Sequence, residues 1–224
     1  MIEIQNSLID WLEEPFKFAV IKRSLNLRYK SRIRYLDIGC GNHSARLSYK
    51  YLHNLEYWGV DKGTYNNDHE DFTAMYRFID QDVEEYEFTD VPNAYFDIVV
   101  LSHVLEHFEN YKVVISKVLP KLSENGIIYI ETPTIQSTTF PSREGTLNFF
   151  DDNTHLNPVP FEDVEHLLES KNFIIVSHGI RKFKRRIFLF PLFLFFSIYK
   201  YGSVVGPVLW DIYGFSWYLV APPS

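Results

Sequence analysis

The fold is decided by one stretch of the chain, Tyr35-Leu36-Asp37-Ile38-Gly39-Cys40-Gly41-Asn42-His43-Ser44. An apolar run leads into a turn with two glycines two residues apart, and a helical pattern follows the turn. Glycine lets the backbone turn sharply and leaves room for a ligand against the main chain. Asp37 precedes this turn, and its carboxylate would repel a pyrophosphate but suits a ligand that carries an ammonium group. An ordinary strand-to-helix turn is the simpler alternative.

Short β-branched and aromatic runs recur on both sides of this turn. They predict strands at 33–38, 55–60, 76–79, 96–101, 127–130 and 173–177. Several are apolar without alternation, as expected for parallel strands that are covered on both faces. Helical patterns lie at 44–52, at 104–122 with a break near Asn110, and at 162–170, while residues 6–30 predict one or two helices interrupted at Pro15. Alternating strands and helices indicate an α/β fold with a doubly wound sheet.

Acidic residues follow the second and third predicted strands. Asp61 ends the second strand, where an acid can accept both hydroxyls of a ribose whose 2′-hydroxyl is unphosphorylated. The third strand leads into Asp80 and Asp82. We favour Asp82 as the acceptor for an exocyclic adenine amine, while Asp80 does the same or ends the strand. For Asp61 the alternative is a solvated loop acid.

A further motif lies at the fourth predicted strand, Phe96-Asp97-Ile98-Val99-Val100-Leu101-Ser102-His103-Val104-Leu105-Glu106-His107. In combination and in order, these motifs resemble the class I S-adenosylmethionine-dependent methyltransferases over residues 33–177. The resemblance implies a seven-stranded, mostly parallel sheet of strand order 3-2-1-4-5-7-6, in which the seventh strand is antiparallel. It also implies S-adenosylmethionine as the cofactor and S-adenosylhomocysteine as the product.

Carried over onto this chain, the resemblance implies a cofactor site. Asp37 would lie near the methionine ammonium, with Gly39 and Gly41 beneath the amino-acid moiety. Asp61 would hold the ribose and Asp82 the adenine. The expected cofactor-binding residues are Asp37, Gly39, Gly41, Asp61, Lys62, Asp82, Val83, Ser102 and His103. The chain departs from the family at His43, where a third glycine is frequent, and this departure concerns the detailed path of the loop.

Methyl transfer requires little acid–base chemistry, because the sulfonium is an activated donor and alignment supplies much of the rate. A hydroxyl acceptor must still lose its proton, so a base helps. We expect the catalytic residues to be His103, after the fourth strand, and His155, in the loop after the fifth. Either histidine can be the base. The neighbouring Asp151 and Asp152 are interpreted as a solvated loop or a helix cap.

A metal site is an alternative use of the same region. His103, Glu106 and His107 open a predicted helix, where their side chains can share a face, and His155 can complete the set. The set looks like the site of small-RNA 2′-O-methyltransferases and some ubiquinone-pathway O-methyltransferases, which place two glutamates and a histidine on that helix. Here His103 replaces the first glutamate, which disfavours a hard magnesium ion. Because Leu-Glu-His also begins this helix in methyltransferases without metal, we expect no metal.

The polar loop at 148–158 resembles loops in bacterial methyltransferases associated with surface-polysaccharide and lipid-linked glycan genes. The expected activity is therefore O-methylation of a hydroxyl on a glycan, a glycolipid or a small metabolite. The alternative enzyme is an NAD-type oxidoreductase or epimerase. Against it stand Asp37, Ser44 at the position of a third dinucleotide glycine, and the lack of a Tyr-x-x-x-Lys pair after the later strands. A non-catalytic S-adenosylmethionine-binding protein is the third possibility.

Composition bounds the remaining classes. The 224 residues are 46% apolar and 23% charged, which indicates one globular domain rather than a disordered chain. Cys40 is the single cysteine and no secretory signal is visible, so we expect a reducing, cytoplasmic location. The net charge of −7 argues against a nucleic-acid partner. Residues 179–224 alone carry +5 and thereby leave −12 on residues 1–178, which would repel phosphate.

The last part of the chain differs from the rest. A basic run at 181–186 precedes 13 uncharged residues at 187–199, which as a helix would span about 20 Å, too short for a bilayer core of about 30 Å. Residues 215–221 predict the last strand, beside 173–177. The segment at 181–200 is therefore interpreted either as a peripheral contact with the inner membrane surface or as a homodimer interface or pocket cover. We expect one methyltransferase domain, with N-terminal helices (1–30), cofactor-binding core (31–178), insertion (179–214) and last strand (215–224).

Overall fold

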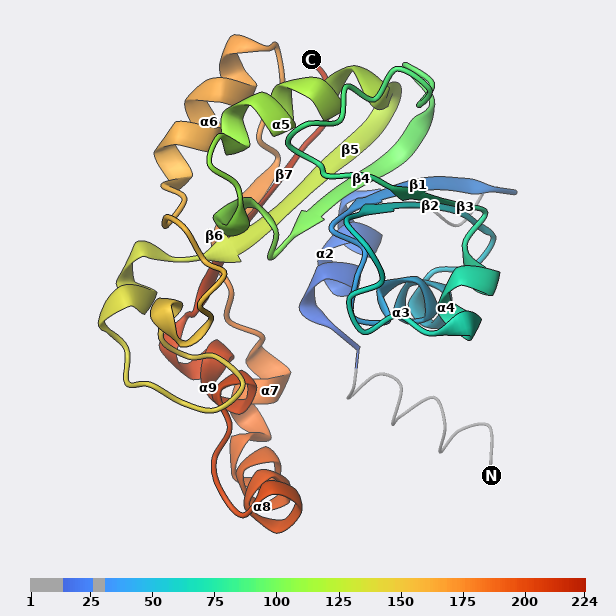
Figure 1. The fold of residues 1–224 in the computed structure, drawn as a ribbon. Helices are drawn as coiled ribbons and strands as arrows, with labels where there is room; N and C mark the ends of the chain where they lie inside the picture. Colours follow the sequence, from blue (N-terminus) through green and yellow to red (C-terminus); the bar gives the residue numbers. More distant parts are fainter. Residues whose placement is uncertain (1–13, 26–30) are drawn as a thin grey trace.

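The computed structural model, which describes residues 14–25 and 31–224, contains a seven-stranded sheet of order β3-β2-β1-β4-β5-β7-β6 (Figure 1). All neighbouring pairs are parallel except those that involve β7, which runs antiparallel between β5 and β6. The predicted strand order and the antiparallel seventh strand are confirmed. The strands are β1 (Ile33–Ile38), β2 (Leu55–Asp61), β3 (Arg77–Asp80), β4 (Phe96–Ser102), β5 (Leu122–Pro133), β6 (Ser177–Ile180) and β7 (Ser216–Ala221).

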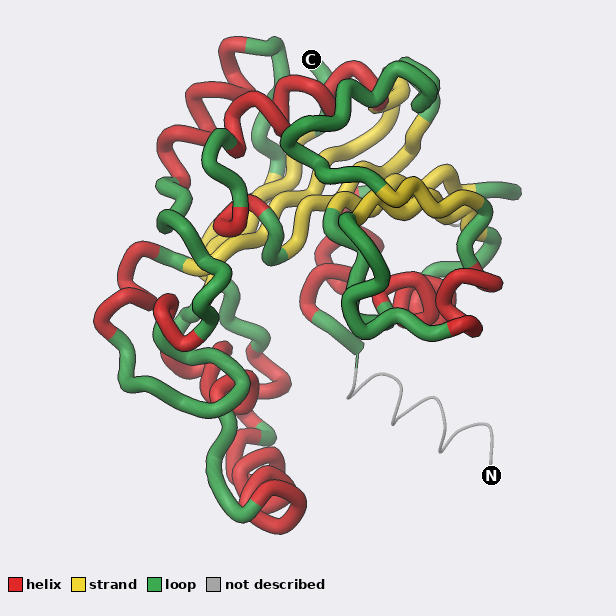
Figure 2. Tube along the Cα trace, viewed as in Figure 1, coloured by secondary structure: helices red, strands yellow, loops and turns green. Residues whose placement is uncertain are grey.

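Helices cover both faces of the sheet (Figure 2). On one face lie α5 (Tyr111–Val118) and α6 (Phe161–Ser170), and on the other α2 (Phe16–Ser24), α3 (Ser44–Tyr51) and α4 (His69–Ala74) (Figure 1). Each face of the sheet has its own hydrophobic core. Because side chains alternate along a strand, Leu36 and Ile38 of β1 pack in the core beneath α5 and α6, and Tyr35 packs in the core beneath α2 and α3. The sheet is thus buried on both sides, as the continuous apolar runs predict.

Three short helices form the insertion between β6 and β7: α7 (Lys184–Phe188), α8 (Phe190–Tyr201) and α9 (Gly206–Tyr213). They lie beyond the carboxyl end of β5, and α8 projects away from the sheet (Figure 1). The chain then returns as β7, as predicted. No helix in the described part of the chain is long and apolar enough to span a bilayer.

Some local predictions need correction. The strand predicted at 173–177 is wrong, because β6 spans Ser177–Ile180 and Phe173 forms only an isolated bridge to Pro223. The apolar side chain of Phe173 instead packs against the core, which explains the misleading pattern. The break near Asn110 is confirmed, since the Asn110 side chain caps α5. Helix α4 was not expected, and the rest of the helical prediction at 6–30 lies partly outside the described residues.

A close contact between β2 and the glycine turn leads to a test of packing. A Cβ on Gly59 would lie 2.5 Å from Sγ of Cys40 and 3.2 Å from Sδ of Met75. We expect Gly59→Ala to lower the free energy of unfolding by about 1–3 kcal/mol through overpacking. Cys40→Ala should relieve part of that loss, so urea unfolding of the two single variants and the double variant should show a favourable coupling. Strictly additive losses would contradict this packing account.

Candidate functional site

The glycine turn after β1 approaches its neighbours so closely that side chains are excluded. Gly39 has φ +75°, and a Cβ there would lie 2.6 Å from Val104. A Cβ on Gly41 would lie 2.8 Å from the Tyr65 ring. His43 adopts φ +60°, a left-handed conformation that glycine enters most readily, so the chain pays some strain where the family often has glycine.

Asp37 is buried at the end of β1, and its carboxylate is held by side chains from two elements. The hydroxyls of Ser44 and Tyr57 each donate to Oδ2 at 2.6 Å. Lys17 of α2 donates in turn to the Ser44 hydroxyl at 3.2 Å. Burial and the nearby Asp37 charge raise the pKa of Tyr57 well above its usual range, so the phenol stays a donor.

Sequence reasoning missed both partners of Asp37, Ser44 and Tyr57, and also Lys17, which donates to Ser44. The alternation of side chains along β2 could have identified Tyr57. Asp37 pairs with Gly59 in the parallel register, and Tyr57 lies two residues before Gly59, so its side chain is on the same face of the sheet as Asp37. Ser44 had been considered only as the residue in place of a third glycine. Lys17 lies on a separate helix, and no local pattern links it to the turn.

Asp61 ends β2 beside the same turn. Its Oδ2 accepts the backbone N–H of Gly41 at 2.8 Å, and its Oδ1 accepts that of Lys62 at 2.8 Å. Partial burial raises the pKa of Asp61, although both backbone donors oppose that shift. The structure therefore brings Asp61 close to the glycine turn that follows Asp37, at the carboxyl ends of the parallel strands, as predicted.

The residues that follow β3 lie at the same carboxyl ends of the parallel strands. Lys62 donates through Nζ to Asp82 Oδ2 at 2.8 Å, which lowers the pKa of Asp82. Asp80 accepts the backbone N–H of Gly63, and the Val83 side chain is buried in the core. The carboxylates of Asp37, Asp61 and Asp82 thus follow one another along the ends of β1, β2 and β3.

His103 follows β4 in a different conformation from the one predicted. It has φ +54° and its backbone N–H donates to Glu131 at 2.7 Å, so no α-helix begins there; a single 3-10 turn (Leu105–His107) follows. Its imidazole lies between Glu106 (Nδ1, 3.4 Å) and Glu131 (Nε2, 3.3 Å). Burial disfavours the charged ring, but the two carboxylates outweigh burial and raise the pKa of His103 to about 9. The ring is therefore an imidazolium at neutral pH.

A buried arginine extends this charged row toward the insertion. Arg181 donates through Nη1 to Glu131 at 2.9 Å, and its Nε lies 3.5 Å from Asp211 of α9. Burial alone would raise the pKa of Glu131, yet Arg181 and His103 lower it well below its usual range. Sequence reasoning missed Glu131 and interpreted Arg181 as part of an exposed basic run.

The four residues considered as an alternative metal site are only partly brought together. Ligand atoms of Glu106, His107 and His155 lie within 4.8 Å of one another, whereas His103 is held between two carboxylates. His107 Nδ1 lies 3.0 Å from the hydroxyl of Thr154. The predicted common helical face of His103 and His107 is wrong, because the 3-10 turn places His107 against the His155 ring, 4.9 Å away.

His155 has a defined tautomer. Its Nδ1 lies 2.6 Å from the carbonyl oxygen of Phe149, which can only accept, so Nδ1 carries the proton. In the neutral form of the ring, Nε2 therefore carries the lone pair, and this atom lies 4.0 Å from Glu106 Oε1 and 3.9 Å from Asp152 Oδ2. Glu106 Oε1 is buried and receives no hydrogen bond of regular geometry from the described residues, although the charged His103 ring lies 3.4 Å away through Nδ1.

The two loop acids have different surroundings. Asp151 accepts the backbone N–H groups of Arg143, Leu147 and Asn148 and bonds the Ser142 hydroxyl. Burial raises its pKa, but these donors prevail and lower the pKa of Asp151 to about 2. Asp151 therefore organises the loop, in agreement with its interpretation as a cap. Asp152 lies beside His155, as described above.

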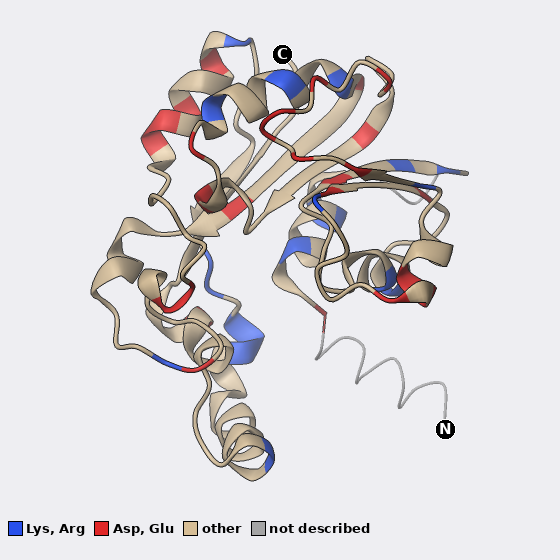
Figure 3. Ribbon diagram, viewed as in Figure 1, with Lys and Arg blue, Asp and Glu red and all other residues tan. Residues whose placement is uncertain are grey.

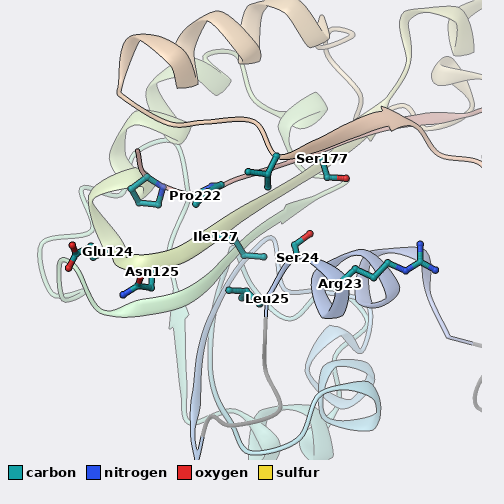
Figure 4. Close-up of a pocket in the computed structure, with 10 residues that line it drawn as sticks. Arg23, Ser24, Leu25, Glu124, Asn125, Ile127, Ser177 and Pro222 are labelled. Atoms are coloured by element: carbon teal, nitrogen blue, oxygen red, sulfur yellow. The ribbon is translucent and has the colours of Figure 1, made fainter.

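A surface pocket lies away from all these residues (Figure 4). It is lined by Arg23, Ser24, Leu25, Glu124, Asn125, Ile127, Val176, Ser177, Pro222 and Pro223. Glu124 and Asn125 belong to the beginning of β5, whereas Glu131 lies near its end. The pocket thus lies at the amino end of β5, at the opposite end of the parallel strands from the glycine turn, and it is not part of the candidate site.

Comparison with solved structures shows the same fold in several methyltransferases. An S-adenosylmethionine-dependent methyltransferase from Archaeoglobus fulgidus is 22% identical, with 91% of each chain covered and a TM-score of 0.56. One from Mesorhizobium loti is 13% identical, covers 94% of this chain and 99% of its own, and has a TM-score of 0.63. Phosphoethanolamine N-methyltransferase 2 from Haemonchus contortus, solved with S-adenosylmethionine, is 16% identical over 96% of this chain and 56% of its own, with a TM-score of 0.60.

A search of curated proteins finds no match. A family model described as "Methyltransferase domain", however, matches residues 13–178, which include β1 to β5 and the acids Asp37 and Asp61 at the ends of β1 and β2. This match covers most of the chain, and the sheet order is that of the fold implied by the sequence motifs. The chain belongs to the methyltransferase-domain family and is a class I methyltransferase that uses S-adenosylmethionine.

Proposed function

We propose that this methyltransferase acts on a hydroxyl of a glycan, a glycolipid or a small metabolite, with His155 as the base. The observation that carries the proposal is the tautomer of His155, whose Nδ1–H is donated to Phe149 and whose Nε2 is left as a proton acceptor. An acceptor hydroxyl has a proton to lose during transfer, so a positioned base would accelerate its reaction. His155 lies in the loop after β5, beyond the carboxyl ends of the strands, where ligands bind in open α/β sheets.

The cofactor would lie along the ends of β1, β2 and β3. S-adenosylmethionine supplies a methyl group already activated on a sulfonium. Asp37, oriented by Ser44 and Tyr57, is suited to the ammonium of its amino-acid part. Gly39 and Gly41 let the turn pack tightly against Val104 and Tyr65, where a Cβ would not fit, and their backbone would run beneath the amino-acid part of the cofactor.

The nucleoside part would occupy the next two strand ends. Asp61, fixed to the Gly41 N–H, is placed for the ribose hydroxyls, and Asp82 for the adenine amine. Lys62 neutralises Asp82 and Val83 offers an apolar wall. Ser102 and His103 would border the cofactor from the end of β4.

The two histidines expected to be catalytic are assigned different roles. His103 is an imidazolium between Glu106 and Glu131 and has no lone pair to accept a proton. His155 has one, and the carboxylates of Glu106 and Asp152 lie within 4.0 Å of Nε2. Those carboxylates would stabilise the imidazolium that forms when His155 takes the proton. We therefore assign the base to His155 and a positioning role to His103.

The surroundings of His155 favour a sugar as the bearer of the hydroxyl. Phe150 exposes its ring in the same loop, and aromatic faces pack against the apolar faces of sugars. Asp152 and Thr154 supply hydrogen-bonding groups next to it. The resemblance of the 148–158 loop to those of bacterial glycan methyltransferases supports the same acceptor class.

Replacement of His155 tests the proposal. With labelled S-adenosylmethionine, the wild type should methylate a glycan or glycolipid fraction, and His155→Gln should lower kcat by at least about a hundredfold, the usual effect of losing a general base. S-adenosylhomocysteine affinity should not change. His166→Gln, at an exposed position on α6, is the matched control. Binding of S-adenosylhomocysteine without transfer to any hydroxyl by the wild type would contradict the proposal and favour a non-catalytic binding protein.

The charge of His103 predicts a pH dependence of stability. Its folded pKa of about 9 exceeds the usual 6.5, so the stabilisation is complete below about pH 6.5 and is lost as pH rises through about 9. Between these values the wild type should lose up to about 3 kcal/mol more unfolding free energy than His103→Gln. Urea unfolding at both pH values gives the comparison. Parallel losses in the two proteins would show that folding leaves the pKa of His103 unchanged, contrary to this account.

A further inference from the structure

The helix α8 is apolar on all sides and yet largely exposed. Phe188, which precedes it, is 84% exposed, while Phe195 and Tyr199 are 63% and 81% exposed. A helix with apolar residues around its whole circumference is normally buried in a protein or in a membrane. Within the part of the chain that the structure describes, only Ser197 of α8 is buried. Such a contiguous apolar surface indicates a binding site for an apolar partner.

The charges around this helix define what the partner can be. Every exposed charged side chain in residues 179–224 is a lysine: Lys182, Lys184 and Lys200. Asp211, the only acid in that segment, is buried and accepts the backbone N–H of Phe183. In the ribbon of Figure 3, basic residues are coloured on α7 and at the far end of α8, while most acidic residues lie on the body of the molecule. The partner therefore combines an apolar interior with negative surface charge.

We propose that α7 and α8 dock on the surface of an anionic lipid bilayer. The phenylalanines of α8 enter the boundary between headgroups and acyl chains, and the lysines contact lipid phosphates. Tyr199 and Tyr201 at the end of the helix suit the interface, where amphipathic aromatic rings are enriched. A second copy of the chain fits less well, because a twofold contact between identical surfaces would oppose lysines to lysines.

Docking also specifies the acceptor, and this part rests on the proposed function. Trp210 of α9 lies against His103, with ring centroids 5.2 Å apart, and its Nε1 donates to the carbonyl of Thr146. Helix α9 packs on both α7 and α8. The bilayer-facing insertion thus forms one wall of the site. Of the three acceptor classes, this geometry favours a lipid-linked glycan, whose sugar stands at the membrane surface.

Vesicle co-sedimentation tests the docking without any methyl transfer. The wild type should bind vesicles of phosphatidylcholine mixed with phosphatidylglycerol at least tenfold more tightly than phosphatidylcholine alone, and salt should weaken the binding. Two variants, Phe195→Ser/Phe196→Ser and Lys182→Gln/Lys184→Gln/Lys200→Gln, should each lose at least tenfold in affinity. Ile174→Ser/Val176→Ser is the matched control, because both side chains are 55% exposed and lie far from α8 in the fold.

Calorimetry with S-adenosylhomocysteine on every variant verifies that the cofactor site is intact. Failure of the wild type to bind anionic vesicles, or equal loss in the control, would overturn the docking proposal. So would a wild-type dimer in light scattering that Phe195→Ser/Phe196→Ser converts to a monomer, since a second copy would then cover α8. Methylation of a soluble hydroxyl without vesicle binding refutes only the docking, and vesicle binding without any methylation refutes only the proposed function.

Discussion

A carboxylate buried at the end of a parallel strand must be hydrogen-bonded, because an unpaired charge in the interior is strongly destabilising. Asp37 meets this constraint through Ser44 at the start of α3 and Tyr57 on β2, and Lys17 connects α2 to the same network. The carboxylate therefore fixes three elements around the glycine turn. This glycine turn also donates the backbone N–H of Gly41 to Asp61. The two acids thereby lie side by side at the carboxyl ends of β1 and β2, where the cofactor is proposed to bind.

A second buried network joins the other half of the site to the insertion. Arg181, Glu131 and His103 alternate in charge along the ends of β5 and β4, and Asp211 anchors α9 to the same row. Breaking one member of such a row leaves an uncompensated charge, so the row restricts where α9 can lie. Helix α9, which forms one wall of the proposed acceptor site, is thereby connected by ion pairs to the His103 imidazolium beside the proposed methyl-transfer site. His155 lies next to this row, with Nε2 4.0 Å from the Oε1 atom of Glu106 that also pairs with His103.

The fold and the positions of the first candidate residues could be predicted because their signals are local. A strand, a glycine turn and an acid at a fixed spacing place Asp37 and Asp61 at neighbouring strand ends, and their binding of the cofactor stays a prediction. The other half depends on contacts between distant segments. Arg181 looks like one member of an exposed basic run until β5 supplies Glu131. His103 looks helical because a left-handed φ of +54° has no sequence signal in a non-glycine residue.

The account depends most on the assignment of Asp61 to the ribose of the cofactor. Calorimetric titration with S-adenosylhomocysteine tests it, on the wild type, on Asp61→Ala and on Glu124→Ala, an exposed acid at the opposite edge of the sheet. We expect micromolar binding by the wild type and the control and at least tenfold weaker binding by Asp61→Ala, about 1.4 kcal/mol or more. None of the three should bind NAD. Equal affinities in all three proteins, or binding of NAD in place of S-adenosylhomocysteine, would contradict the account.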